Sequence, residues 1–166
     1  MATRKLRQED LEHFRKHNLG QSLMEVARHF QRHALEGFLK EGHAGLQASH
    51  QAVLTHLSLS GTRLTELAKR ASMTKQAMGQ LVDEVESLGY VERIPDPTDR
   101  RAKLVRFTEK GCQLMKSGTR VGDSIHQRYT EILGERKMER LRGLLGELHT
   151  KIRVLESREE TEDLAV

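Results

Sequence analysis

Residues 89–111 read GYVERIPDPTDRRAKLVRFTEKG, and they contain two short runs of strand-forming residues. The runs are Tyr90–Ile94 and Lys103–Phe107, and the turn-forming residues Pro95–Asp99 separate them. This pattern predicts a β-hairpin with a long tip, because β-branched and aromatic residues favour strands whereas proline and aspartate favour turns. The tip and the following strand are basic, with Arg100, Arg101, Lys103 and Arg106 uninterrupted by a carboxylate. A rigid basic hairpin is suited to an anionic polymer.

Two short helices are predicted immediately before this hairpin. Apolar residues recur at helical spacing over Leu64–Ala71 and again over Met78–Leu88, and the short segment Ser72–Thr74 separates them. Thr74 is the expected N-cap of the second helix, and Gly89 is its expected end. Two helices across a three-residue turn form a helix-turn-helix. The second helix is expected to present side chains that can contact base edges or phosphates, at Lys75, Gln76, Gly79, Gln80 and Asp83.

Longer amphipathic helices flank this central part. One is predicted over Leu23–Phe38 and a shorter one over Leu46–Leu57, while a third starts at Thr108 and breaks at Gly134. The last helix has apolar residues at alternating spacings of three and four. Such a narrow apolar seam is typical of a helix that packs against another helix. These stripes exceed what a small helix-turn-helix can cover, so we predict a two-fold dimer interface. Its expected residues are Leu23, Phe30, Met138, Leu141, Leu145, Leu148, Ile152 and Leu155.

Composition fits one compact domain with helical extensions. The chain has 166 residues and a formal net charge of +4. Its apolar fraction of 36% is low for a protein that must form its whole core as a monomer. The single cysteine, Cys112, excludes an internal disulfide and a multi-cysteine zinc site within one chain. No apolar run approaches the length of a bilayer, and the N-terminus lacks an apolar signal-peptide core. We therefore expect a cytoplasmic protein without a membrane span.

Several motifs follow one another in a familiar order, namely Leu64-Thr65-Glu66-Leu67-Ala68, Thr74-Lys75-Gln76, Leu81-Val82-Asp83, Gly89-Tyr90-Val91-Glu92-Arg93 and Asp99-Arg100-Arg101. On these residues the chain resembles the multiple antibiotic resistance regulator (MarR) family of winged helix-turn-helix transcriptional regulators, which act as dimers. The family's wing signature is Asp-x-Arg followed by Leu-Thr. It corresponds here to Asp99 and Arg101, with Phe107-Thr108 in place of Leu-Thr.

The resemblance implies a mainly α fold with a small β-hairpin wing. Residues 1–45 would form an N-terminal dimerisation region, residues 46–111 the DNA-binding domain, and residues 112–166 the C-terminal dimerisation helices. The helix over Thr74–Leu88 would enter the major groove, and the wing over Pro95–Lys103 would enter the minor groove. The residues expected to bind DNA are Arg63, Thr74, Lys75, Gln76, Gly79, Gln80, Asp99, Arg100, Arg101 and Lys103.

Within the wing, Asp99 is expected to hold Arg101 for the narrow minor groove, where a guanidinium gains most. A simple pairing of the two side chains within a turn remains an alternative. Glu84, Glu86 and Asp83 make the second half of the recognition helix acidic, which shifts the expected phosphate contacts toward the wing and the positions Arg63, Lys69 and Arg70.

The function implied is that of a homodimeric, sequence-specific regulator, most simply a repressor, on a pseudo-palindromic operator in double-stranded DNA. A small aromatic or other effector would bind in a crevice near Phe30, His33 and Leu54. No cofactor is expected, and no motif combines a nucleophile, a base and an orienting group, so we expect no enzyme and no catalytic residue.

Two alternatives remain open at this point. An architectural DNA-binding protein would share the basic wing but have little base preference. A metal-responsive regulator could use His29 and His33, whose i,i+4 spacing can hold a metal, although no third ligand is evident nearby and we predict no metal site.

Overall fold

The computed structural model describes the backbone of residues 7–163 and, within that range, every side chain except those of residues 13, 16, 17, 100 and 156–163. The predicted fold class is confirmed, because the described residues are mostly helical with one small antiparallel sheet. The chain divides into two compact units, one ending at Gly122 and the other beginning at Asp123. The predicted boundaries at residues 45 and 111 separate dimerisation regions from a DNA-binding region, and they do not coincide with the boundary between the two compact units. This division by function stays a prediction.

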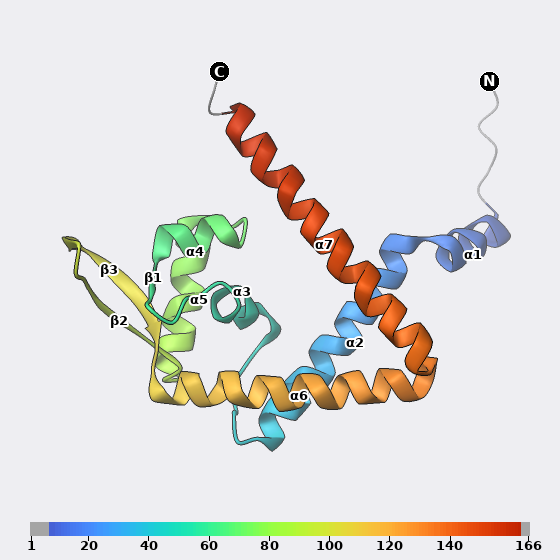
Figure 1. Cartoon of the computed structure of the whole chain (residues 1–166), viewed down its shortest axis with the longest axis horizontal. Coiled ribbons are helices and arrows are strands. Elements are labelled where there is room, and N and C mark those ends of the chain that lie inside the picture. The colour runs from blue at the N-terminus through green and yellow to red at the C-terminus, as the bar shows by residue number, and fades with distance from the viewer. Residues whose placement is uncertain (1–6, 164–166) are drawn as a thin grey trace. The chain divides into compact units, whose positions relative to one another are not determined.

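The first unit contains the helix-turn-helix and the wing (Figure 1). Its elements in chain order are α1 (Gln8–His17), α2 (Leu19–Lys40), the 3-10 turn η1 (Ala48–His50), α3 (Gln51–Leu54), β1 (Thr62–Arg63), α4 (Leu64–Arg70), α5 (Lys75–Ser87), β2 (Val91–Asp96), β3 (Asp99–Phe107) and the first half of α6 (Glu109–Leu133). The second unit contains the rest of α6 and α7 (Glu135–Asp163).

The helix-turn-helix forms for the local reasons that the sequence suggested. The hydroxyl of Thr74 accepts a hydrogen bond from the Ala77 amide at 3.2 Å, so Thr74 is the N-cap of α5. The α4 helix ends where the Met73 amide donates to the Ala68 carbonyl at 2.9 Å, with Ser72 in the left-handed region at φ 51°. Gly89, at φ 79°, ends α5 in the same way. These local bonds set the angle between the two helices.

The inner face of α5 anchors this arrangement in the core. Met78, Val82 and Val85 are fully buried, one helical turn apart, as are Leu67 of α4 and Tyr90 at the base of the wing. Removing this apolar face from water supplies the main stabilisation of a short helix that would be marginal alone. The inner face of α5 is therefore fixed by packing against the core.

The wing differs from the prediction in two respects. The sheet has three strands in the order β1-β3-β2, because Thr62 and Arg63 pair with Val105 and Leu104 of β3. The prediction of a long loop over Pro95–Asp99 is wrong, since Asp96 pairs with Asp99 and the turn between them has only two residues. The carboxylate of Asp96 forms this tight turn by accepting hydrogen bonds from the Thr98 amide and hydroxyl at 2.8 and 2.7 Å.

Two helical predictions also need correction. The helix expected over Leu46–Leu57 is shorter, because the chain first forms the turn η1 and then the single helical turn α3. The Ser58 amide donates to the Thr62 hydroxyl at 3.0 Å, which turns the chain toward β1. The first helix, α1, was not predicted.

A polar network joins the loop after α2 to α6. The Ser117 hydroxyl bonds the ring Nε2 of His43 at 3.1 Å and donates to Glu41 at 3.3 Å, and Arg120 donates to both Ser117 and Glu41. The hydrogen bond from Arg120 is the main cause that lowers the pKa of Glu41. Close packing of the same helices is possible because Gly37 of α2 lies against Val121, where a Cβ would approach within 2.8 Å.

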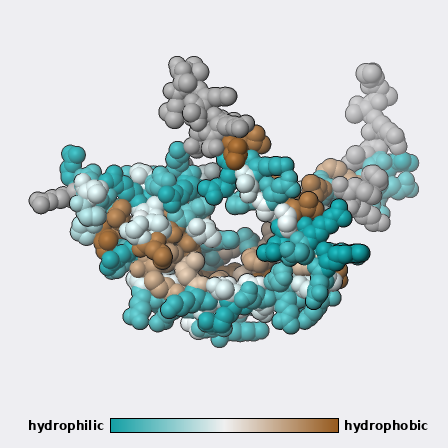
Figure 2. Space-filling model, viewed as in Figure 1, coloured by the Kyte–Doolittle hydropathy of each residue, from teal (hydrophilic) through white to brown (hydrophobic). Residues whose placement is uncertain are grey.

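In the second unit, α7 buries little of its apolar seam. Met138 is 9% exposed, whereas the exposed fractions of the other seam residues range from 37% to 57%, namely Leu141, Leu145, Leu148, Ile152 and Leu155. The space-filling view likewise shows a mostly hydrophilic surface with separate apolar areas (Figure 2). Within residues 7–163, every helix is too short or too polar to cross a lipid bilayer.

Candidate nucleic-acid interface

The outer face of α5 carries, in its N-terminal half, polar side chains without a partner among the described residues. Lys75, Gln76 and Gln80 are exposed and make no hydrogen bond or ion pair within the described part of the chain. At Gly79 between them, an added Cβ would meet only Leu64 at 3.8 Å, an ordinary contact. The chain's own packing therefore does not require a glycine here. A surface with an open backbone and two carboxamides can approach the floor of a DNA groove.

The acidic half of α5 is neutralised from inside the fold. Arg93 of β2 bonds Asp83 at 2.6 Å through one guanidinium nitrogen and Glu86 through the other. The Arg93 amide also donates to Glu86 at 3.0 Å. The carboxylates that cast doubt on contact between this helix and phosphate are thus engaged, and they connect the recognition helix to the sheet.

Glu84, the remaining acidic residue in this part of α5, is held by a buried histidine. His50 is 2% exposed, and its ring Nε2 lies 2.9 Å from the Glu84 carboxylate. The other ring nitrogen accepts the Gln47 amide at 3.2 Å. Because Nδ1 accepts, the proton of the neutral ring must lie on Nε2, which donates to Glu84. His50 is therefore a positioning residue between η1 and the recognition helix.

The tip of the wing is organised around Asp96 and Arg63. Asp96 is buried, and its second oxygen accepts a hydrogen bond from Nε of Arg63 at 2.7 Å. The Nη2 atom of Arg63 lies 2.7 Å from the same oxygen in an ion pair. Hydrogen bonds from Thr98, followed by those from Arg63, lower the pKa of the Asp96 carboxyl from 3.8 to about 2. Arg63, which was predicted to contact DNA, thus forms an ion pair with Asp96 that connects β1 to the turn of the wing.

Arg101 is the most open cation of the wing among the described side chains for which an ion pair is recorded. Its side chain is 96% exposed, and its guanidinium lies 3.8 Å from Asp99. The Asp99 carboxylate accepts the Arg101 backbone amide at 3.1 Å, so it orients the backbone more than the side chain. The register jumps from the Pro95–Lys103 pair to the Asp96–Asp99 pair, which leaves residues 100–102 bulged. The bulge aims Arg101 outward.

The other predicted DNA-binding positions have varied surroundings. Lys103 is exposed and free of any partner among the described residues, whereas Arg70 donates to Glu66 at 2.8 Å and to the His56 carbonyl at 3.1 Å. The side chain of Arg100 lies outside the described residues. Contact of these positions with DNA stays a prediction.

Sequence reasoning missed Asp96, Arg93 and His50 as residues that shape this surface. Only Asp96 had a local signal, since aspartate two residues before threonine is typical of a side-chain-capped turn. The partners of Arg93 and His50 are brought close by packing between elements, which no short spacing in the sequence encodes.

The predicted dimer residues of the first unit remain uncovered. Leu23 and Phe30 of α2 are 46% and 40% exposed, and Met24 and Val26 are also exposed. Burial of these residues in a dimer stays a prediction.

The rings of His29 and His33 lie close together on α2. The ring nitrogens of His29 and His33 approach within 3.1 Å, and His33 also bonds Glu36 at 3.1 Å. Among the described residues, no group of three or more potential ligands could hold a metal ion.

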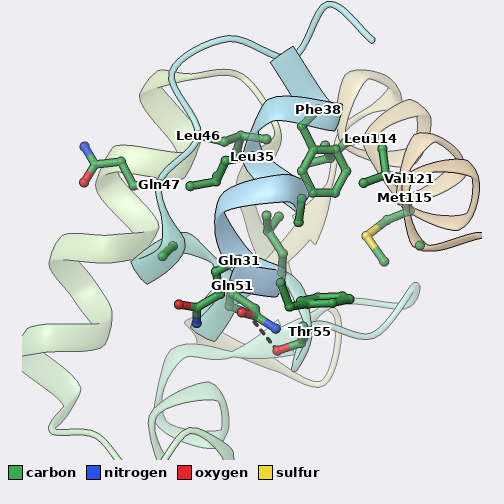
Figure 3. A pocket seen from close by; sticks show the side chains of 16 residues that line it. Gln31, Leu35, Phe38, Leu46, Gln47, Gln51, Thr55, Leu114, Met115 and Val121 are labelled. Carbon is green, nitrogen blue, oxygen red and sulfur yellow. Dashed lines mark hydrogen bonds between the residues drawn. The ribbon is translucent and has the colours of Figure 1, made fainter. Parts of the chain in front are cut away.

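A pocket lies between α2, the η1–α3 segment and α6 in the first unit (Figure 3). Phe30 and Leu54, two of the three residues expected near an effector, line this pocket. His33 does not line it, because its ring is turned toward His29 and Glu36.

A helix-turn-helix joined to a three-stranded wing defines the winged helix-turn-helix class of proteins. Residues 44–102 match the sequence model of the MarR family. Multiple antibiotic resistance protein MarR of Escherichia coli K12 is 33% identical over 81 residues, which are 48% of this chain and 56% of that protein. In sequence, the winged helix-turn-helix of this chain is therefore similar to that of the MarR family.

Solved structures agree with this assignment. Wild-type MarR of Escherichia coli in its apo form has a TM-score of 0.63 and 27% identity, with 78% of this chain and 96% of that chain covered. CouR from Rhodococcus jostii RHA1, bound to p-coumaroyl-CoA, has a TM-score of 0.61 and 26% identity, with 80% and 92% covered. In sequence, the alignment spans little more than half the length of the curated Escherichia coli relative.

Asp96 makes the stability of the wing depend on pH. Its lowered pKa means that the carboxylate stabilises the folded state fully above pH 3.8 and loses this effect as the pH falls toward about 2. The difference in the free energy of unfolding between the wild type and Asp96→Asn, measured by denaturant titration, should shrink across that interval. Thr98→Ala removes the hydrogen bond from the hydroxyl that contributes most to the lowered pKa of Asp96. The pKa of Asp96 in the folded state should therefore rise toward 3.8, and the pH range over which the stability changes should become narrower. An Asp96→Asn protein with an unaltered pH profile would contradict this assignment.

Proposed function

We propose that this protein is a homodimeric transcriptional regulator that binds a pseudo-palindromic DNA operator. The observation that carries the proposal is the open face of α5, where Lys75, Gln76 and Gln80 have no partner while every nearby carboxylate of the helix is engaged internally. That face belongs to the same compact unit as the exposed Arg101 of the wing. A cytoplasmic, non-enzymatic protein follows from the same proposal.

In the major groove, Gln76 and Gln80 provide the base contacts. A glutamine carboxamide can donate to N7 of adenine and accept from its N6 amino group in a bidentate pair, and Lys75 can reach guanine or a phosphate. Gly79 lets the backbone approach between them. Thr74 occupies the helix N-terminus, where backbone amides and the helix dipole favour a phosphate.

In the minor groove, Arg101 provides the second contact on each half-site. A guanidinium gains most where the groove is narrow and its potential is strongest, so flanks rich in A·T are preferred. The bulge at residues 100–102 supports this role because it directs the side chain away from the sheet. Lys103 adds a phosphate contact beside it.

Two copies of the chain are needed to place these elements on DNA. The uncovered apolar residues of α2 and the seam of α7 support association through helices. A two-fold dimer would present its α5 helices to half-sites about 10 bp apart, one helical turn of DNA.

Repression relieved by a small molecule is the mode of action we propose. A ligand that binds preferentially to a dimer with displaced recognition helices lowers operator affinity by its differential affinity for the two forms. The pocket between α2 and α6 supports this mode, as does the p-coumaroyl-CoA bound in the related CouR.

Selection of duplexes from a random pool tests the function directly. A regulator should enrich one pseudo-palindrome and bind it about a thousandfold or more tighter than random duplex at fixed salt. Uniform affinity for all duplexes would favour the architectural alternative, and no affinity for DNA would refute both.

Replacing Arg101 with Ala should weaken operator binding about tenfold or more. The magnitude of the negative slope of log affinity against log salt concentration should decrease by about one. The preference for A·T flanks should diminish as well. Fluorescence anisotropy over a salt series measures both quantities. Arg106→Ala is the matched control, because Arg106 lies on the same strand but pairs with Glu92 at 2.8 Å. An Arg101→Ala protein with the affinity of the wild type would exclude the groove role.

Replacing Leu145 with Glu should split the dimer and abolish operator binding together, because a carboxylate in an apolar helix seam cannot be buried without a partner. Light scattering reports the mass, and anisotropy reports the binding. Arg140→Ala, on the same helix but outside the seam, should change neither. A monomer that keeps full operator affinity would contradict the dimer.

A further inference from the structure

Two histidines of α2 bring their ring Nε2 atoms close together. The Nε2 atoms of His29 and His33 lie 3.1 Å apart, while the ring centroids are 4.3 Å apart and the ring planes are tilted by 59°. The spacing of four residues places both side chains on one face of the helix, one turn apart. The rings therefore converge at their nitrogen atoms rather than stacking face to face.

The distance between these nitrogen atoms matches that of two ligands on one metal ion. An imidazole nitrogen binds zinc at about 2.0–2.1 Å, so two such ligands are roughly 2.9 Å apart at a right angle and roughly 3.4 Å apart at the tetrahedral angle. The observed separation of 3.1 Å lies between these two values. The backbone of α2 thus already holds both atoms at the distance that a chelated ion requires.

Glu36 orients one of the two rings. Its carboxylate lies 3.1 Å from Nδ1 of His33, which is three residues earlier on α2. A carboxylate accepts a hydrogen bond from the protonated nitrogen of a neutral ring, so Nδ1 of His33 carries the proton and Nε2 keeps its lone pair. In protein metal sites an outer carboxylate fixes the tautomer of a ligating histidine in this way and raises its basicity as a ligand.

An ion can reach this pair of histidines from solvent. The side chains of His33 and Glu36 are 21% and 53% exposed, and His29 is half-buried. Within residues 7–163, no third His, Cys, Asp or Glu among the described side chains joins the pair to hold a metal ion. Water would fill the other coordination positions, whereas structural zinc sites take all four ligands from the protein. The geometry therefore suits an ion that exchanges with solvent.

Two arginines precede these histidines, but they belong to the adjacent face of the helix. Arg28 and Arg32 line a neighbouring cavity together with Leu35 and Leu39. Side chains one residue apart on a helix do not face each other. The guanidinium groups therefore lower the affinity for a cation only through a field that salt screens, and they do not occupy the ligand positions.

We infer that His29 and His33 form a binding site for a divalent transition-metal ion, with Glu36 as the positioning residue of His33. The sequence predicted no metal site because it showed no third ligand. The distance between the two Nε2 atoms and the contact of His33 with Glu36 favour instead a site with two protein ligands. Imidazole suits Cu²⁺, Ni²⁺ and Zn²⁺, whereas Mg²⁺ and Ca²⁺ prefer oxygen ligands. Because affinity peaks at Cu²⁺ in this series, Cu²⁺ should bind most tightly.

A bound ion would stabilise α2 itself. The unfolded chain does not hold the two rings at a chelating distance, so the ion binds the folded helix preferentially and raises its stability. The same helix carries Leu23 and Phe30, which are predicted to form the dimer interface. The ion would thus stiffen the helix that presents these residues. This inference does not rest on DNA binding, and it can hold or fail independently of the proposed function.

Calorimetric titration of the untagged, full-length protein, freed of metal with a chelator and then dialysed, tests the site. We expect Cu²⁺ to bind more tightly than Ni²⁺ or Zn²⁺, and we expect no binding of Mg²⁺. Electron paramagnetic resonance of the bound Cu²⁺ should show hyperfine structure from two imidazole nitrogens. A protein that binds none of the three transition-metal ions would overturn the inference.

Variants assign the bound ion to these residues. The double variant His29→Gln/His33→Gln should lose one equivalent of bound Cu²⁺, whereas Glu36→Gln should keep that equivalent and bind it about tenfold more weakly. Glu147→Gln is the control matched in charge, because Glu147 pairs with Lys151 on α7 and should affect neither quantity. Full stoichiometry in the double variant would refute the site. Wild-type affinity in Glu36→Gln would refute the positioning role.

Other residues of the chain can also bind metal ions, and two further variants separate them from this site. His13 and His17 form a second pair at the same spacing, and Cys112 is the only cysteine and is exposed. His13→Gln/His17→Gln and Cys112→Ser should each retain the equivalent of Cu²⁺ that depends on His29 and His33. Loss of that equivalent in either variant would place the ion elsewhere and overturn the assignment.

Discussion

Internal neutralisation of the recognition helix is the constraint on which the remaining structure depends. The helix α5 carries Asp83, Glu84 and Glu86, and a polyanion would repel these carboxylates if they were free. Arg93 engages two of them and His50 the third. The same bonds connect α5 to β2 and to η1, so charge compensation and positioning of the helix arise from one set of contacts. The polar N-terminal half of α5 is left as its open surface.

Features governed by neighbouring residues could be predicted from the sequence. The cap at Thr74 and the helix end at Gly89 each depend on bonds within a few residues, and both were correct. The strand β1 was missed because two residues carry no periodic signal and are defined only by pairing with β3. The turn of the wing was misjudged because Asp96 closes it through contacts with Thr98 and the distant Arg63.

The candidate effector site shows a similar division. Phe30 and Leu54 line the pocket between α2 and α6, whereas His33 contacts Glu36 instead. The binding of an effector in this pocket stays a prediction. The composition of the pocket wall depends on how three separate segments of the chain pack together. A residue-by-residue comparison cannot supply this information.

The wing has a further consequence for how copies of this chain can meet. The strand β2 is at one edge of the sheet, and Pro95 within it lacks the amide hydrogen that a neighbouring strand would require. Charged residues Glu92 and Arg93 occupy the same strand, and the opposite edge, β1, is only two residues long. Short, charged and proline-interrupted edges disfavour strand addition and amyloid-like stacking. The wings of two neighbouring molecules are therefore poor partners for strand pairing, although each wing is a β-structure with two edges.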